Sequence, residues 1–282
     1  MGLGVNINKQ VGARYSGPLD ELGNVDNCAL GVAPYKRLTF LYDDYLVLVV
    51  RVDDLEERYF YADYNGNIVE ADVLAWLGAS EGVVKKAANQ LQDSNEAYQN
   101  TLADMPAITI SNVFQSNGLY YDGSNSWLRI NDYAAIQITE PPYSAYSNAI
   151  AYGVGEAIYS KCLNSHINAQ YFLAHYEHRI ELWHKNINFE INNAWTELAI
   201  NKIMTTWRDK NANGFLTHTL LNEYTHTLGV TLTNRPNVTI GARSNAVDCS
   251  SVSVWLDGNI KTVLLFSSNE YLKYNDFVNQ GL

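Results

Sequence analysis

Four glutamates in the second half of the chain are the residues best suited to acid–base chemistry. They are Glu177, Glu181, Glu190 and Glu197, on or beside predicted strands. A retaining glycosidase needs two carboxyl groups about 5–5.5 Å apart, and an inverting one needs about 6.5–9.5 Å. Spacing along a sequence does not establish that two carboxylates converge. Because these glutamates alternate with other polar residues, the pattern is typical of a solvated sheet face, and we assign no catalytic residue.

Three histidines in the same region, His175, His178 and His184, raise the question of a metal site. Side chains alternate between the two faces of a strand, so His175 and His178 would point to opposite faces. No Cys or His pair at ligand spacing lies nearby, whereas zinc needs three or four converging ligands. We therefore predict no metal site.

Two Asp-Gly pairs, Asp122-Gly123 and Asp257-Gly258, offer carboxylates of the kind that bind calcium. Asp-Gly is also a favoured pair in tight turns between strands. We interpret both pairs as turns, and we predict no cofactor, with calcium as the alternative.

Several tyrosines lie in segments predicted as loops. Tyr143, Tyr146 and Tyr152 surround the Pro141-Pro142 pair, and Tyr224 lies in a later connection. Tyrosine can stack on a sugar ring or become buried against a partner protein. We predict these four residues as a carbohydrate-binding set, and the sequence does not separate the two uses.

The composition narrows the function. The net charge is −11, so no basic surface is expected for nucleic acid or for an anionic membrane. Cysteines occur only at Cys28, Cys162 and Cys249; this odd number, widely spaced, indicates free thiols in a reducing cytoplasm. No basic-then-apolar leader and no run of membrane-spanning length appears.

The order of apolar residues predicts a β-rich chain. Residues 1–33 are rich in glycine and polar residues, and we expect an extended arm that attaches the protein to a neighbour. Residues 34–107 should hold leading strands, a helix from Val69 to Leu77 that Gly78 ends, and a long polar excursion over 81–108. From residue 108 to 282, strands recur every 8–12 residues, including 117–121, 127–130, 134–138 and 252–266, which is typical of a sandwich.

Short motifs give this pattern a family resemblance. Residues 117–130 and 254–266 are similar to the opening and closing strands of the concanavalin A-like lectin/glucanase fold, a LamG-like jelly roll. Further motifs resemble a segment shared by arabinofuranosidase B-type catalytic domains and phage structural proteins; they include 35–38, 49–52, 82–84, 97–99, 105–108 and 119–124. That family usually has Trp-Tyr-Asp-Gln-Ser-Gly-Asn where this chain has residues 87–93, and only Gln90 is kept.

We therefore predict an all-β, concanavalin A-like jelly-roll sandwich of two antiparallel sheets over 34–282, with a short helix and the N-terminal arm. The resemblance implies a non-enzymatic structural protein of a tailed bacteriophage, on a tail or capsid surface. Its expected partners are other virion proteins and further copies of itself, together with weakly bound host-surface glycans. Its expected location is the virion, assembled in the host cytoplasm. A carbohydrate-binding lectin module is the alternative, and a glycosidase of the arabinofuranosidase type is the second alternative.

Overall fold

The structure is a computed structural model, and it describes most of the chain. The described residues are 15–23, 25–91, 95–137, 143–152, 156–161, 171–176, 179–184, 187–192, 201–207, 213–217, 222–225, 237–244, 252–253, 255–268, 270 and 274–282. Between 171 and 225 only the backbone of the strands is described, not their side chains.

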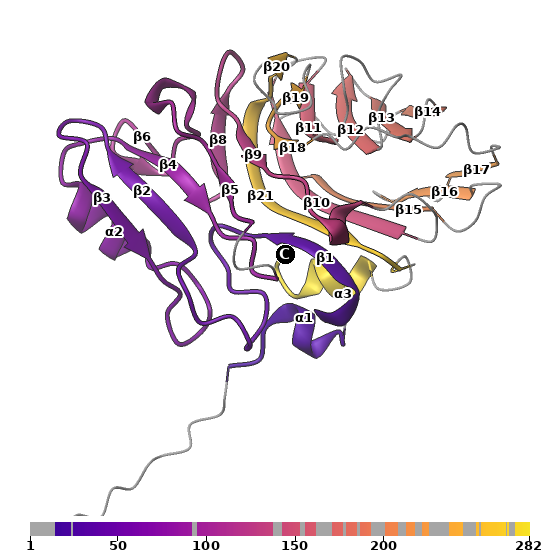
Figure 1. Cartoon of the computed structure of the whole chain (residues 1–282), viewed down its shortest axis with the longest axis horizontal. Helices are drawn as coiled ribbons and strands as arrows, with labels where there is room; N and C mark the ends of the chain where they lie inside the picture. Colours follow the sequence, from indigo (N-terminus) through magenta and orange to yellow (C-terminus); the bar gives the residue numbers. More distant parts are fainter. Residues whose placement is uncertain are drawn as a thin grey trace, which may run out of the picture.

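Two antiparallel sheets lie face to face, which confirms the predicted all-β sandwich (Figure 1). The first has seven strands: β1 (Cys28–Val32), β21 (Asp257–Phe266), β10 (Tyr143–Ala151), β15 (Asn201–Trp207), β16 (Asn213–Thr217) and β17 (Asn222–Thr225) in order, with β8 (Leu119–Asp122) also paired to β21. The second has ten: β14 (Ile187–Asn192), β13 (Arg179–His184), β12 (Tyr171–Tyr176), β11 (Glu156–Lys161), β18 (Val238–Ile240), β9 (Leu128–Ile130), β5 (Ala97–Tyr98), β4 (Gly82–Ala87), β2 (Val47–Arg51) and β3 (Glu57–Phe60).

Smaller elements surround the two sheets. Two hairpins pair β6 (Thr109–Ile110) with β7 (Val113–Phe114) and β19 (Arg243–Ser244) with β20 (Val252–Ser253). The described helices are α1 (Pro18–Glu21), α2 (Glu70–Leu77) and α3 (Tyr274–Asn279), with 3-10 turns η1 (Val25–Asn27), η2 (Leu102–Asp104) and η3 (Ala134–Ile136). No helix in the described part of the chain is long and apolar enough to cross a membrane.

The main core lies between the sheets and follows strand alternation. Val47 and Val49 of β2 are fully buried in it, together with Ile130 of β9. Val263 and Leu265 of β21 in the opposite sheet belong to the same cluster. Successive side chains of a strand point to opposite faces, so the positions between these residues lie on the outer face of each sheet.

Strand β21 joins distant parts of the chain. It pairs with β10 along one edge, and along the other edge it pairs with β8 through Asp257–Ile260 and with β1 through Val263–Phe266. Gly258 lies where β21 passes β10, and a Cβ there would lie 2.0 Å from the Ile150 carbonyl oxygen. Only glycine fits such a close backbone approach.

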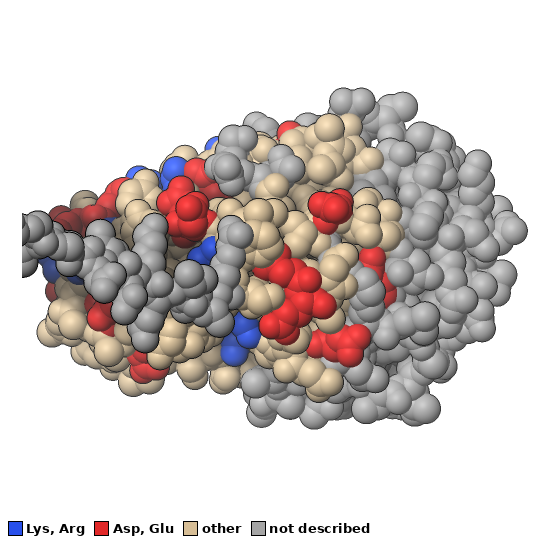
Figure 2. Space-filling view, turned by 90° about the horizontal axis from the view of Figure 1, so that it is seen from below, with Lys and Arg blue, Asp and Glu red and all other residues tan. Residues whose placement is uncertain are grey.

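The two terminal helices cover the outer face of the seven-stranded sheet at β1, β21 and β10 (Figure 1). Phe266 of β21 lies 5.3 Å, between ring centroids, from Phe277 of α3, and both are fully buried with Leu19 of α1. Burying one such side chain contributes about 1.5–3 kcal/mol. Acidic side chains are spread over this side of the molecule, seen from below in Figure 2; α1 and α3 contribute Asp20, Glu21 and Asp276.

Residues 15–33, which the sequence assigns to the arm, are packed against the sandwich. Asp20 accepts hydrogen bonds from the backbone N–H groups of Gly17 and Phe40 and from the Thr39 hydroxyl. Strand β1 is buried along its whole length. Residues 1–14 lie outside the described residues, so the attachment role of the arm stays a prediction.

Gln90, which the sequence resemblance singled out, anchors this N-terminal segment. Its side chain is 3% exposed. The Oε1 atom accepts a hydrogen bond from the Leu38 N–H at 2.6 Å, and Nε2 donates to the carbonyl oxygens of Ala33 and Lys36. A buried amide whose donors and acceptor are all engaged fixes the chain between β1 and β2.

Of three further predictions from sequence, one helix is confirmed, and two segments differ from what was expected. Helix α2 is confirmed, with Glu70 and Asp72 in its first turn and Gly78 at φ 63° ending it. Residues 134–136 form the 3-10 turn η3 and not a strand. The excursion over 81–108 contains two strands of the larger sheet, β4 and β5.

The close approach at Gly258 gives a stability prediction. We expect Gly258→Ala to destabilise the fold by about 3 kcal/mol, because the added methyl group forces β21 away from β10. Gly23→Ala is the matched control, because Gly23 has φ 64° and open space around it. This variant should lose only about 1–2 kcal/mol of unfolding free energy, from the strained backbone alone. Urea unfolding measures both variants, and equal destabilisation would contradict the steric argument.

Candidate functional site

Two of the four glutamates considered from sequence occupy paired positions. Glu181 of β13 and Glu190 of β14 are direct register partners in an antiparallel ladder. Glu177 and Glu197 lie outside the described residues. Opposite positions of two antiparallel strands share one face of the sheet, with Cβ atoms about 4.5–5.5 Å apart. The backbone therefore brings together two carboxylate-bearing positions that lie nine residues apart in sequence.

The register assigns this pair of positions to the outer face of the larger sheet. One row of paired positions crosses four neighbouring strands and therefore shares one face. It runs from Thr239 of β18 through Ser160 of β11 and Phe172 of β12 to Trp183 of β13. Thr239 belongs to the outer row, because its neighbour Ile240 is in the core between the sheets. Glu181 lies two positions from Trp183 and hence on the same face.

A groove of about 530 Å³ lies beside η2 and β6. It holds two carboxylates, and both are engaged in hydrogen bonds. Glu81 Oε2 accepts a hydrogen bond from the Thr109 hydroxyl at 3.0 Å, and its Oε1 accepts one from the Asn112 N–H at 3.2 Å. A general acid or base needs an accessible proton site, so the groove does not supply a catalytic pair. The rest of its lining is mostly apolar, including Val52, Val83, Leu102, Met105 and Ile110.

Asp122, the second carboxylate of the groove, organises its own turn. Its Oδ1 accepts hydrogen bonds from the N–H groups of Ser124, Asn125 and Ser126 at 3.0–3.1 Å. Partial burial alone would raise the pKa of Asp122, but these hydrogen bonds outweigh it and lower the pKa to about 2. Such a carboxylate acts as a structural acceptor, not as an acid near neutral pH.

The two Asp-Gly pairs meet in the structure, but in different roles. Asp122-Gly123 forms a turn, as predicted, with Gly123 at φ 72°. Asp257-Gly258 is not a turn and begins strand β21, where Asp257 is the register partner of Asp122. Asp257 Oδ1 accepts a hydrogen bond from the Tyr120 hydroxyl at 3.1 Å. The Asp-Gly pattern wrongly predicted a turn at Asp257-Gly258. Glycine is needed there because β21 approaches β10 closely, not because the chain turns.

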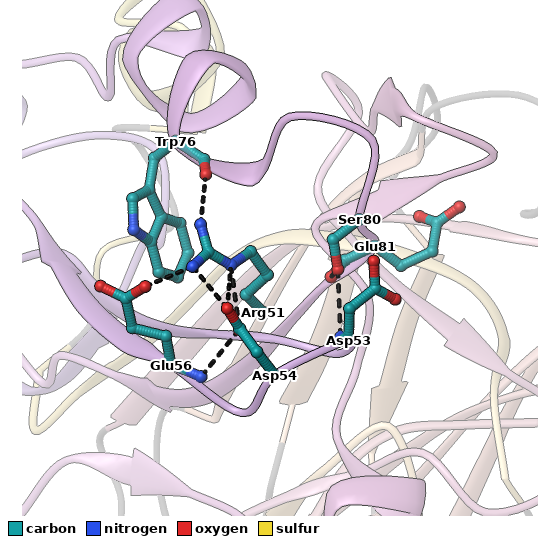
Figure 3. Close-up of polar contacts among 7 residues, drawn as sticks. All are labelled: Arg51, Asp53, Asp54, Glu56, Trp76, Ser80 and Glu81. Carbon is teal, nitrogen blue, oxygen red and sulfur yellow. Dashed lines mark hydrogen bonds and ion pairs between the residues drawn. The ribbon is translucent and has the colours of Figure 1, made fainter.

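The densest described polar network surrounds Arg51 (Figure 3). Its Nε and Nη2 atoms donate to the Asp54 carboxylate, Nη2 also to Glu56, and Nη1 to the Trp76 carbonyl oxygen at 2.9 Å. The guanidinium carbon lies 5.1 Å from the centroid of the Trp76 ring. The hydrogen bond from Arg51, with a second one from the Glu56 N–H, lowers the pKa of Asp54 to about 2. This network ties the β2–β3 turn to α2 and has a structural role.

The four predicted sugar-binding tyrosines do not gather on one surface. Tyr146 is fully buried, 5.6 Å from Phe277 between ring centroids; it is a core residue, which corrects its assignment to a sugar platform. Tyr152 is 42% exposed, and its hydroxyl donates to Asn259 Oδ1 at 2.7 Å. The side chains of Tyr143 and Tyr224 lie outside the described residues. The carbohydrate-binding role of Tyr152, Tyr143 and Tyr224 stays a prediction.

Two further kinds of reactive side chain are possible metal ligands and thiols. Among the described residues, no three His, Cys, Asp or Glu side chains are grouped so that they could hold a metal ion. The side chains of His175, His178 and His184 lie outside that set. Cys28 is buried, which raises the pKa of its thiol; Cys162 and Cys249 are not described.

Comparisons with family models and with curated sequences find no match, but solved structures do match. They include a GH54 α-L-arabinofuranosidase soaked with a cyclic sulfate inhibitor (TM-score 0.65), a mutant of such an enzyme soaked with 4-nitrophenyl α-L-arabinofuranoside (0.66), and an arabinofuranosidase complexed with arabinofuranosyl-α-1,2-xylobiose (0.62). Each is 12% identical, over 94% of this chain. The chain spans 65% of the length of each enzyme. At this identity the likeness shows the fold alone, a β-sandwich similar to that of these enzymes.

The comparison corrects the predicted function. The prediction of a non-enzymatic tail or capsid protein of a bacteriophage is wrong, because these matching structures are glycoside hydrolases. The expectation that the chain is not an enzyme is corrected on the same ground. The resemblance to arabinofuranosidases is supported, whereas the phage, LamG-like assignment is not. The predicted virion partners and location remain untested.

The turn at Asp122 gives a pH-dependent prediction. We expect Asp122→Asn to destabilise the protein by about 1 kcal/mol at neutral pH, after allowance for solvent screening of this half-exposed group. The folded-state pKa lies below the ordinary value, so the difference from wild type should be complete above about pH 4. It should then vanish as the pH falls through about 2.

Chemical unfolding at several pH values measures this difference. Asp43→Asn is the control, because Asp43 is exposed and its carboxylate accepts no hydrogen bond in the described part of the chain. A difference between Asp122→Asn and wild type that stays constant from pH 7 to pH 2 would exclude the ionised carboxylate as its cause.

Proposed function

We propose that this chain is a glycoside hydrolase domain that removes arabinofuranosyl residues from glycans. The observation that carries the proposal is the register pairing of Glu181 with Glu190. Retaining glycosidases need carboxyl groups about 5–5.5 Å apart, and directly opposite strand positions start from a matching Cβ separation. The substrate class comes from the fold likeness to arabinofuranosidases over 94% of the chain.

The neighbouring register pairs support a sugar site at these strands. Trp183 pairs with Asn188, and Arg179 pairs with Asn192, so that both pairs flank the two glutamates at a distance of two residues. These positions share the face of Glu181 and Glu190. Aromatic, amide and charged residues around a carboxylate pair are typical of sites that bind a sugar ring and its hydroxyl groups.

Both carboxyl groups that the reaction uses would come from this chain, and water is the second substrate. One glutamate carboxylate attacks the anomeric carbon and forms a covalent ester with the sugar. The other carboxyl group gives its proton to the leaving oxygen, and so the glycosidic bond breaks without leaving an alkoxide. The second carboxylate then takes a proton from water, which cleaves the ester and releases the sugar.

Hydrolysis of 4-nitrophenyl α-L-arabinofuranoside, followed by nitrophenol absorbance, tests the activity. We expect Glu181→Gln and Glu190→Gln each to lower kcat by about 10²–10⁴-fold, because each removes one catalytic carboxyl group. Glu177→Gln and Glu197→Gln are matched controls and should keep the wild-type rate. Absence of hydrolysis by the wild-type protein would refute the proposal, and so would full activity in both test variants.

The separation of the two carboxylates also predicts the stereochemistry. We expect the first product to keep the anomeric configuration of the substrate, because a closely spaced pair works through a covalent intermediate. Proton NMR during the first minutes of hydrolysis distinguishes the two anomers before they equilibrate. An inverted first product would mean carboxyl groups about 6.5–9.5 Å apart, which directly opposite positions do not provide.

A further inference from the structure

A small polar pocket opens on the outer face of the ten-stranded sheet, away from the glutamate pair. It has a volume of about 240 Å³, which is below the range of about 300–1,000 Å³ for drug-sized ligands. Strands β4, β5 and β9 and their connections form it. The lining residues are Lys86, Asn95, Glu96, Tyr98, Asn100 and Asn131.

The strand register holds the pocket residues in place. Tyr98 of β5 pairs with Lys86 of β4 on one side and with Arg129 of β9 on the other. The guanidinium carbon of Arg129 lies 4.6 Å from the centroid of the Tyr98 ring. Lys86 Nζ lies 2.7 Å from Glu96 Oε1. Side chains that are fixed before binding lose little entropy when a ligand arrives.

The chemistry of the lining selects an uncharged ligand rich in hydroxyl groups. The Lys86 ammonium is neutralised by Glu96, so the pocket offers no unpaired charge of its own to an anion. The Tyr98 hydroxyl donates to Asn131 Oδ1 at 3.1 Å. Within the described residues, the side-chain NH₂ groups of Asn100 and Asn131 donate no hydrogen bond to protein. An amide supplies both donors and an acceptor, which matches the hydroxyl groups of a sugar.

We propose that this pocket is an accessory subsite that binds one sugar unit of a neutral glycan chain. It rests on the proposed function only for the choice of glycan. Five strand steps separate β5 from β13, which is about 24 Å at the usual spacing, and both lie on the same face. On that face, between β5 and β13, Thr239 and Ser160 are buried, and their hydroxyl groups donate hydrogen bonds to the Ala242 carbonyl oxygen. The pocket is therefore separate from the Glu181–Glu190 positions.

Binding of soluble arabinoxylan and of arabinan to the whole protein tests the proposal, by affinity electrophoresis and calorimetry. We expect Tyr98→Ala and Asn131→Ala each to weaken polymer binding about tenfold, because each removes part of the lining. The same variants should hydrolyse 4-nitrophenyl α-L-arabinofuranoside at the wild-type rate, since that substrate does not reach from β13 to β5. Tyr64→Ala is the matched control, because Tyr64 is 86% exposed and lies outside the pocket.

The outcomes separate this proposal from the hydrolase proposal. Wild-type protein that binds polymer through Tyr98 but hydrolyses nothing supports the subsite and refutes the hydrolase. Protein that hydrolyses the small substrate, with polymer binding unaffected by Tyr98→Ala and Asn131→Ala, overturns the subsite alone. Failure of the wild-type protein to bind either polymer also overturns it. Unfolding curves of all three variants exclude loss of the fold as the cause, and Tyr98→Phe, which keeps the ring, should retain most of the binding.

Discussion

Strand β21 is the constraint on which the rest of the structure depends. Its ten residues pair with β10 along one edge and with β8 and β1 along the other. The same strand places Ile260 and Val263 in the core between the sheets, and Leu264 and Phe266 beneath the terminal helices. A strand buried on both faces must be apolar on both, which explains the almost continuous apolar run from Val263 to Phe266.

Alternation within the larger sheet decides where chemistry can occur. In the described part of the chain its inner face is filled by apolar residues, so in that part only the outer face is left for polar side chains that meet a ligand. Both the register pair Glu181–Glu190 and the pocket around Tyr98 lie on that face. By contrast, the carboxylates of Glu81, Asp122 and Asp54 are held by hydrogen bonds that stabilise turns. These three carboxylates thus have structural roles, which distinguishes them from the residues of the two proposed sites.

Sequence reasoning recovered the fold class and helix α2, because strand alternation and the Gly78 end signal are local. It named Glu181 and Glu190 among four candidates, yet it could not pair them, since register depends on contacts between strands. Tyr146 was misplaced because a tyrosine beside prolines has the same local pattern whether it is exposed or buried. Tyr98 and Lys86 were missed for a related reason: β5 has only two residues and β4 contains two adjacent lysines. The strand character of both comes from the neighbours that pair with them.

The backbone of the N-terminal segment holds the side chain of Gln90. Its amide is satisfied by three backbone groups of residues 33–38, so its value is independent of the residues beside it in sequence.

The pairing of Cys28 with Phe266 also has a consequence for how the protein folds. Strand β1 cannot find its partner until β21, about 240 residues further along the sequence, is available. Contacts of such sequence separation slow folding. Until β21 arrives, β1 and β8 expose unpaired backbone edges that invite association with other chains. Chains truncated before β21 should therefore be recovered as aggregates more readily than as soluble fragments.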